Sequence, residues 1–158
     1  MKRAFLILFV LTTTNLVSKG QVNPNLFGFR TSSSFVFFDV KDSVFMNDVQ
    51  SLSPNVLSFP GGFGNFYHLN GVGYGLEIEE IKKNHTGKKS KQASGLNRII
   101  KKKSHTRNYI YDFIEMAKIT RSSVIYDANI ISSDPQEVLQ VIKLFLSNNI
   151  KLLGVELG

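Results

Sequence analysis

The feature that most constrains the fold is the alternation of short apolar segments with a clearly marked helix between residues 122 and 158. Residues 122–130 (SSVIYDANI) and 152–157 (LLGVEL) are dominated by apolar side chains, as is typical of buried strands. Between them, Asp134 and Pro135 are residue types that begin a helix, and the apolar periodicity that follows predicts a helix ending near Ser147. Strand, helix and strand in this order predict a parallel sheet with crossover helices.

The same alternation extends toward the N-terminus. The expected strands are residues 26–31 and 56–59, and the expected helices are residues 42–52 and 109–119. Asp42 and Asn108 are suitable N-caps for these two helices. Residues 35–40 (FVFFDV) favour either a further strand or a packed loop. The fold class expected from these patterns is α/β, built of parallel βα units.

The first residues resemble a targeting segment. Lys2 and Arg3 precede an apolar stretch over residues 4–11, which is too short to span a bilayer. We therefore expect a signal peptide over residues 1–20 and one domain over residues 21–158; an uncleaved anchor or a buried helix is the alternative. The chain contains no cysteine, so its stability after export would depend on its core and not on disulfides. We expect a secreted protein, or one of the periplasm or cell envelope, with no membrane attachment after cleavage.

The basic residues are concentrated in one stretch. Ten of the 19 lysines and arginines lie between residues 82 and 107, where there is no acidic residue. This polar stretch predicts a basic, mobile surface loop at about 82–107. Binding of an acidic polymer, such as a sulfated or uronic polysaccharide, is the alternative. Nucleic acid is not an expected partner, because no basic face with a reading element is indicated.

A segment rich in glycine and aromatic residues covers residues 60–75 (PGGFGNFYHLNGVGYG). Glycine allows tight turns and close approach of the backbone to a ligand, and aromatic rings offer flat surfaces on which sugar rings stack. A structural loop packed by its own aromatic residues is the alternative.

Three segments together resemble the N-terminal half of retaining glycosidases with a (β/α)8 barrel, especially heparanase-like and arabinofuranosidase-like hydrolases. The segments are LSPNVLSFPGGFGNFYH (52–68), FIEMAKITRSSVIYDANI (113–130) and DPQEVLQVIKLFLSNNIKLLGVELG (134–158). The resemblance implies the first half of a TIM barrel in an enzyme that cleaves polysaccharide or oligosaccharide glycosidic bonds. In that family Glu-Leu-Gly is followed by Asn and the catalytic acid/base, whereas the sequence ends at Gly158. We therefore expect an inactive N-terminal fragment whose partners are carbohydrate and either a missing C-terminal half or a second copy.

The resemblance also implies which residues bind substrate. They are Gly61, Gly62, Asn65, Tyr67, His68 and Asn129. Alternation along the strands places a second group on common faces, which would point into the barrel: Ser58, Asp127 and Glu156. Ser58 stands where the family has arginine. We expect Arg30 to pair with Glu156 in its place; an exposed Arg30 without this role is the alternative.

Other catalytic chemistry is not indicated. No nucleophile elbow, phosphate loop, dinucleotide fingerprint or metal-ligand spacing occurs, so no cofactor, metal or catalytic residue is assigned. The alternative to an enzyme fragment is a secreted protein that binds carbohydrate or an acidic polymer without catalysis.

Overall fold

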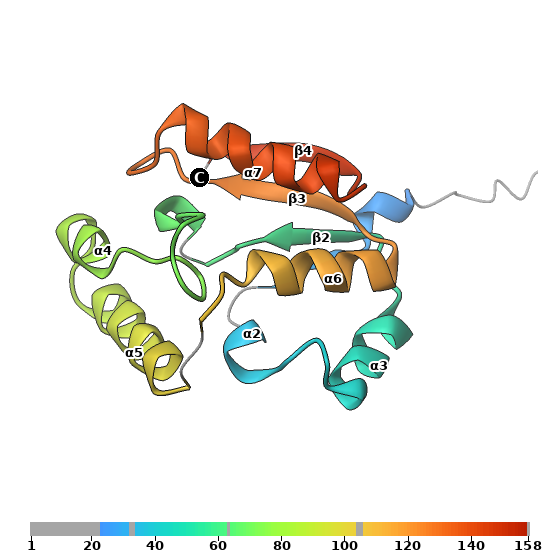
Figure 1. Cartoon of the computed structure of the whole chain (residues 1–158), viewed down its shortest axis with the longest axis horizontal. Helices are drawn as coiled ribbons and strands as arrows, with labels where there is room; N and C mark the ends of the chain where they lie inside the picture. The colour runs from blue at the N-terminus through green and yellow to red at the C-terminus, as the bar shows by residue number, and fades with distance from the viewer. Residues whose placement is uncertain (1–22, 32–33, 63, 104–105, 158) are drawn as a thin grey trace, which may run out of the picture.

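The computed structural model describes residues 23–31, 34–62, 64–103 and 106–157. The predicted signal peptide therefore lies outside the described residues. Four strands, β1 (Gly28–Arg30), β2 (Val56–Phe59), β3 (Ser123–Ala128) and β4 (Leu152–Leu157), form one sheet in the order β1-β2-β3-β4. All three pairings are parallel, which confirms the α/β architecture of parallel βα units (Figure 1).

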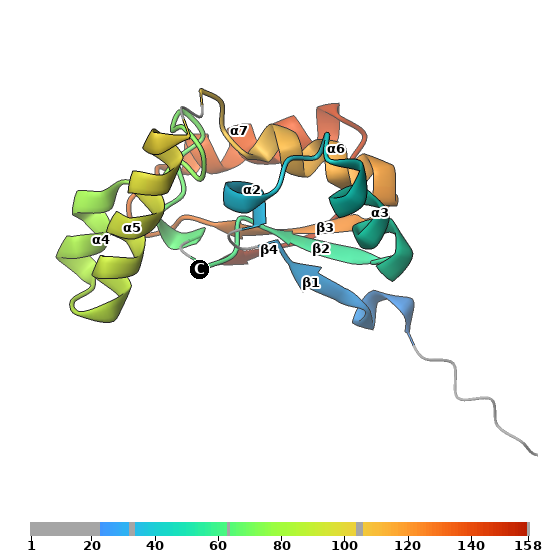
Figure 2. The same ribbon diagram turned by 90° about the horizontal axis from the view of Figure 1, so that it is seen from below.

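The crossover helices lie on one face of this sheet (Figure 2). They are α2 (Ser34–Phe37) and α3 (Ser43–Leu52) after β1, α6 (Ile110–Thr120) before β3, and α7 (Pro135–Ser147) before β4. Two of these helices begin as predicted. Asp42 accepts hydrogen bonds from the amides of Val44 and Phe45, and Asp134 accepts one from the amide of Glu137.

The core forms between this face and the helices. Phe59 and Tyr126 point toward the helices and are almost fully buried. The ring of Phe59 lies 4.9 Å from that of Phe113 on α6, and the ring of Tyr126 lies 5.9 Å from that of Phe145 on α7. Aromatic packing at these distances holds the helices against the strands.

Among the described residues, no α-helix lies on the opposite face of the sheet (Figure 2). Within the described sheet β4 pairs with β3 alone, and five of its six residues are exposed, so the expectation of a buried last strand is wrong. Within the described part of the chain the sheet is open, with β1 and β4 as its edges, and it does not close into a barrel. None of the described helices has the length and apolar character needed to cross a bilayer.

Two segments differ from the predictions. Residues 35–40 form neither strand nor plain loop, because Phe35 and Val36 are buried on the short helix α2, where packing decides the conformation. The stretch 82–107, expected to be a loop, is largely helical: α4 (Ile78–Asn84) is followed by α5 (Lys88–Lys102). Ala93 and Ile100 are buried on one side of α5, and this small apolar face anchors the helix. Both helices lie beyond the carboxyl ends of the strands (Figure 1).

Candidate functional site

Four polar side chains share the helix-free face near the carboxyl ends of the strands. The register pairs Arg30 with Ser58 and Asp127 with Glu156. Asp127 lies two residues beyond Ile125, the register partner of Ser58, and therefore shares its face. We call Arg30, Ser58, Asp127 and Glu156 the sheet-face cluster.

The cluster is held together by Arg30. Its Nη2 atom donates to Oε2 of Glu156 at 2.7 Å, and its Nη1 atom lies 3.5 Å from Oδ2 of Asp127. This is the pairing expected for Arg30 and Glu156. The side chains of Arg30 and Glu156 are each 52% exposed, whereas that of Asp127 is 5% exposed. The cluster thus joins a buried carboxyl group to a solvent-accessible ion pair.

Asp127 is the electrostatically unusual member. Burial raises its pKa to about 6, against the opposing charge of Arg30 and with a further contribution from Glu156. Its Oδ2 atom accepts a hydrogen bond of 3.2 Å from the Gly61 amide. Its Oδ1 atom and the buried hydroxyl of Ser58 make no hydrogen bond to another described residue. Both atoms are buried from solvent, so the groups that the cluster offers to a ligand are those of the half-exposed Arg30 and Glu156.

The glycine-rich segment is organised by Asn108, which precedes α6. The Asn108 Nδ2 atom donates to the carbonyls of His68, Leu69 and Gly71, and its Oδ1 atom accepts from the Tyr67 hydroxyl at 3.0 Å. The same oxygen accepts from the amide of Ile110 at the start of α6. The N-cap of α6 is Tyr109, without a side-chain cap hydrogen bond, so the prediction of Asn108 as the N-cap is wrong by one residue. Asn108 thus fixes the path of a loop that lies far from it in sequence, a role that the sequence pattern did not reveal.

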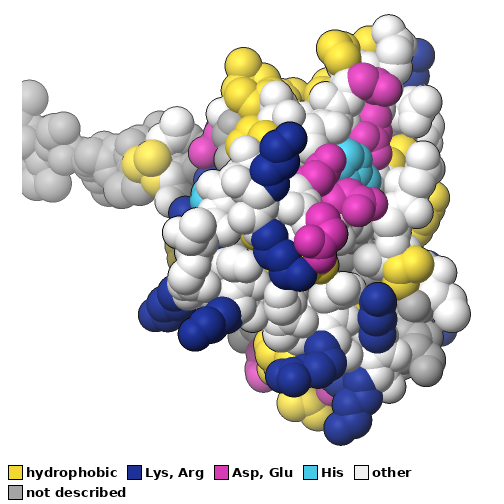
Figure 3. Space-filling view, turned by 90° about the vertical axis from the view of Figure 1, so that its left-hand side faces the viewer, with side chains coloured by type: hydrophobic (Ala, Val, Ile, Leu, Met, Phe, Trp, Pro, Cys, Tyr) yellow, Lys and Arg dark blue, Asp and Glu magenta, His cyan; other side chains and the backbone are white. Residues whose placement is uncertain are grey.

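His68 forms the centre of a second polar network. Its Nδ1 atom lies 3.0 Å from Oε2 of Glu137 on α7, and its Nε2 atom lies 3.3 Å from Oε2 of Glu80 on α4. Burial lowers the pKa of His68, but the hydrogen bonds and charges of Glu137 and Glu80 outweigh it, so the pKa is raised. Figure 3 shows acidic side chains gathered around a histidine, with lysine or arginine side chains next to them. The network connects the glycine-rich segment with α4 and α7.

Further contacts reinforce this network. The pKa of Glu137 is affected first by burial, which raises it, but hydrogen bonds from Ser133, the Leu69 amide and His68 lower it overall. Asn129 is buried and donates to the carbonyl of Tyr67 at 3.1 Å.

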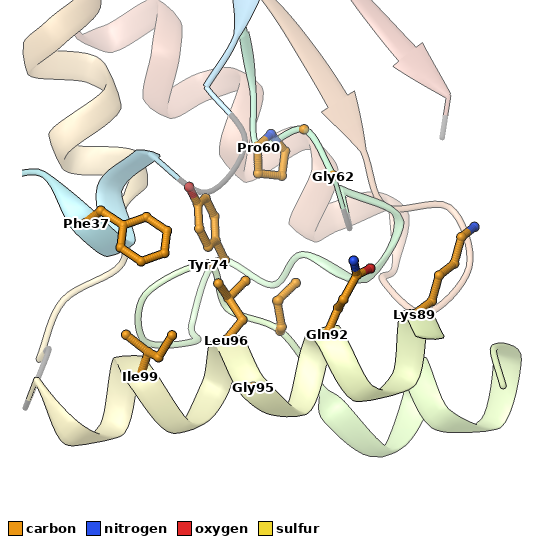
Figure 4. Close-up of a pocket in the computed structure, with 11 residues that line it drawn as sticks. Phe37, Pro60, Gly62, Tyr74, Lys89, Gln92, Gly95, Leu96 and Ile99 are labelled. Carbon is orange, nitrogen blue, oxygen red and sulfur yellow. The ribbon is translucent and has the colours of Figure 1, made fainter. Parts of the chain in front are cut away.

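The predicted substrate-binding residues are therefore separated by the structure. Tyr67, His68 and Asn129 are engaged with the protein itself. Asn65 lies in the short helix η2 (Gly64–Phe66), beside β3. Gly61 and Gly62 line a cavity of about 540 Å³ between the glycine-rich segment and α5, shown in Figure 4. This cavity and the sheet-face cluster are two candidate ligand sites, and His68 and Glu137 line a further, polar cavity of about 360 Å³.

Neither the described residues nor known proteins identify the site further. Among the described residues, no group of three or more His, Cys, Asp or Glu side chains is placed to hold a metal ion. Comparison with protein-family models, with curated proteins and with solved structures gives no match. The geometry of the two sites is therefore the basis of the functional argument.

Proposed function

We propose that this chain provides the opening βα units of a (β/α)8 barrel of the glycoside hydrolase type, and that it binds carbohydrate at the sheet-face cluster. The observation that carries the proposal is the presence of Arg30, Ser58, Asp127 and Glu156 on the helix-free face of four parallel strands, near their carboxyl ends. In barrels of this kind the helices cover one face, the other face points to the axis, and ligands bind at the carboxyl ends.

The chemistry of the cluster suits sugar hydroxyls. Each hydroxyl both donates and accepts hydrogen bonds, so a sugar is best bound by donors and acceptors placed side by side. Arg30 supplies charged donors and Glu156 supplies acceptors, and both side chains are half-exposed, whereas the oxygens of Ser58 and Asp127 that lack a described partner are buried. Hydrogen bonds to such charged groups are stronger than those between neutral groups.

The proposed role of this chain is binding and not bond cleavage. Retaining glycosidases need two carboxyl groups that are free to act as acid/base and nucleophile. Asp127 and Glu156 both contact Arg30 and lie within β3 and β4, not beyond the strand tips where catalytic residues of barrels are found. In this proposal the catalytic groups come from a complementary barrel half.

Isothermal titration with a panel of neutral oligosaccharides tests this proposal. We expect binding that is weakened at least about tenfold in Arg30→Met, because charged hydrogen bonds contribute roughly 1.5–3 kcal/mol each. The matched control is Arg98→Met, an exposed arginine on α5, which should bind like the parent. Absence of binding across the panel, or equal affinity of Arg30→Met and the parent, would contradict the proposal.

A second candidate function is binding of an acidic polymer through α5. Lys88, Lys91, Arg98 and Lys102 are exposed and separated by three, seven and four residues, so they form one stripe along the helix. Such a stripe can contact successive anionic groups of a chain. Retention on heparin that is lost when these four residues are replaced by glutamine, but kept in Arg30→Met, would favour this candidate over the first.

A further inference from the structure

A serine, a histidine and a glutamate are joined by hydrogen bonds beyond the carboxyl end of β3. The Oγ atom of Ser132 lies 3.2 Å from Nε2 of His68, and Nδ1 of the same ring lies 3.0 Å from Oε2 of Glu137. A hydroxyl at one ring nitrogen and a carboxylate at the other is the arrangement of a nucleophile, its general base and the group that orients the base. This arrangement occurs on unrelated folds and is recognised by its geometry.

Glu137 has the charge and the orientation that this role requires. Its Oε1 atom accepts from the Leu69 amide at 2.6 Å, and its Oε2 atom accepts from the Ser133 hydroxyl. Burial raises the pKa of Glu137, but these hydrogen bonds and that of His68 lower it overall. The carboxylate is therefore ionised at neutral pH and keeps a proton on Nδ1 of His68, so that Nε2 of the neutral ring is the acceptor.

Asn129 orients Ser132 from the other side. Its Oδ1 atom accepts from the amides of Ile131 and Ser132, which fixes the orientation of the Asn129 amide group, and its Nδ2 atom donates to the Ser132 hydroxyl at 2.9 Å. Since Nδ2 can only donate, the hydroxyl proton of Ser132 is left for His68. The hydrogen bonds thus run from Asn129 through Ser132 to His68, the direction in which a general base removes the proton.

Backbone amides that can stabilise negative charge on a carbonyl oxygen follow Ser132. The amides of Ser133 and of Gln136, in the first turn of α7, donate no hydrogen bond to another described residue. In hydrolases with a serine nucleophile, the amide of the residue after the serine is a common donor to the oxyanion. Ser132 also lies just before the N-terminus of α7, which is the positive end of the helix dipole.

A small molecule has access to this group. Ser132 is partly exposed, and the side chain of His68 is 19% exposed. The cavity of about 360 Å³ beside His68 and Glu137 lies within the range of small-molecule sites, roughly 300–1,000 Å³. Glu77 and Asp134 also line it, and no lysine or arginine is among its described lining residues. The cavity therefore favours neutral or positively charged groups over anionic ones.

We propose that Ser132, His68 and Glu137 form the catalytic triad of an ester hydrolase that acts on small esters without negative charge. The Ser132 oxygen attacks the carbonyl carbon while its proton passes to Nε2 of His68, and the alcohol leaves with that proton. Water then attacks the acyl group on Ser132 and gives a proton to His68; the acid is released, and the proton returns to Ser132. This activity is separate from glycoside cleavage and does not rest on carbohydrate binding at the sheet-face cluster.

Glu80 determines the pH at which the triad acts. Its Oε2 atom lies 3.3 Å from Nε2 of His68, the atom that must accept from Ser132, and a carboxylate at this position favours the protonated ring. Burial lowers the pKa of His68, but the hydrogen bonds and charges of Glu137 and Glu80 raise it overall. A protonated ring cannot remove a proton, so the reaction rate should increase as the pH rises through this raised pKa.

Labelling of the full chain with diisopropyl fluorophosphate, a small neutral probe, tests the proposal. The serine oxygen attacks the phosphorus, fluoride leaves and the proton passes to the base, so the label marks an activated serine. Peptide mass spectrometry should find the label on Ser132 and none there in Ser132→Ala. Ser147→Ala, an exposed serine at the other end of α7, is the matched control and should be labelled like the parent. At about pH 8, His68→Gln should be labelled at least about a hundredfold more slowly.

Two glutamates test the pH dependence and the substrate class. Glu80→Gln should shift the midpoint of the labelling rate to lower pH, a change that a purely structural network would not produce. Glu77→Gln should increase the rate of hydrolysis of mono-4-nitrophenyl glutarate, an anionic ester, about twofold to fivefold relative to that of 4-nitrophenyl acetate.

Arg30→Met should be labelled like the parent, so failure of carbohydrate binding would not imply failure here. Absence of label on Ser132, undiminished labelling in a His68→Gln protein that urea denaturation shows to be folded, or an unchanged pH profile of Glu80→Gln would overturn the proposal.

Discussion

Replacement of Asp127 by asparagine is expected to stabilise the protein at neutral pH, although it removes a member of the sheet-face cluster. The side chain is 5% exposed, and burial raises its pKa to about 6 from an ordinary value of 3.8. The charge of Arg30 opposes this rise without cancelling it. Asparagine has nearly the same shape, carries no charge, and retains an oxygen that can accept from the Gly61 amide.

The magnitude follows from proton linkage. Below about pH 4 the carboxyl group is protonated in the folded and unfolded chains, so its ionisation costs nothing. Between about pH 4 and 6 the unfolded chain loses the proton first, and the folded state loses stability as the pH rises. Above pH 6 Asp127 is ionised in both states, and its ionisation lowers the stability of the folded state by the full amount. The rise in pKa from 3.8 to about 6 corresponds to about 3 kcal/mol. Asp127→Asn should therefore match the parent near pH 4 and exceed its free energy of unfolding by up to about 3 kcal/mol at pH 7.5.

Urea denaturation at several pH values between about 4 and 7.5 measures this difference. The control is Asp48→Asn, an exposed carboxylate on α3, which should change the free energy of unfolding by less than about 0.5 kcal/mol. An Asp127→Asn protein that is less stable than the parent at pH 7.5, or a difference that does not vary with pH, would show that ionisation of Asp127 does not destabilise the folded state.

Three further changes test other parts of the structure. His68→Gln should lower the free energy of unfolding by about 1 kcal/mol below pH 6.5, because the protonated ring pairs with Glu80 and Glu137. This loss should become smaller as the pH rises above the raised pKa of His68, and urea denaturation at several pH values measures it. Asn108→Ala should lower the free energy of unfolding, measured by urea denaturation, by about 3 kcal/mol or more. Asn108→Asp should not restore it, because aspartate lacks the amide donors to the three carbonyls. Gly95→Ala should gain about 0.5–1 kcal/mol, seen as a higher thermal midpoint, and an unchanged or lower midpoint would contradict the free space found there.

The sheet could be predicted because its signals are local. The four apolar segments, and the N-caps Asp42 and Asp134, each depend on residues a few positions apart. The prediction of a strand or packed loop over residues 35–40 was wrong, because Phe and Val favour strands only where they can pack on a pleated sheet, whereas here they belong to α2. For α5 a signal was present: Ala93, Leu96 and Ile100 recur at helical spacing among lysines, which are good helix formers.

The candidate sites also include contacts that the sequence predicts and contacts that it does not. The Arg30–Glu156 pair could be predicted, because strand alternation and the sequence order of a parallel sheet bring their ends together. The cavity could not, because Phe37, Tyr74 and Lys89 come from three elements whose relative placement no local pattern determines. The contacts of His68 with Glu80 and Glu137 could not be predicted either, because these residues come from a loop and two helices; His68, a predicted substrate-binding residue, is part of this partly buried network.

We propose that the helix-free face of the sheet binds carbohydrate through the sheet-face cluster, and an amide-resolved NMR titration of the chain with neutral oligosaccharides tests this binding. We predict that the amide signals of Arg30, Gly61 and Glu156 shift with saturable dependence on sugar concentration. A titration in which these three signals stay unchanged, while others shift or none do, would contradict carbohydrate binding at the sheet-face cluster.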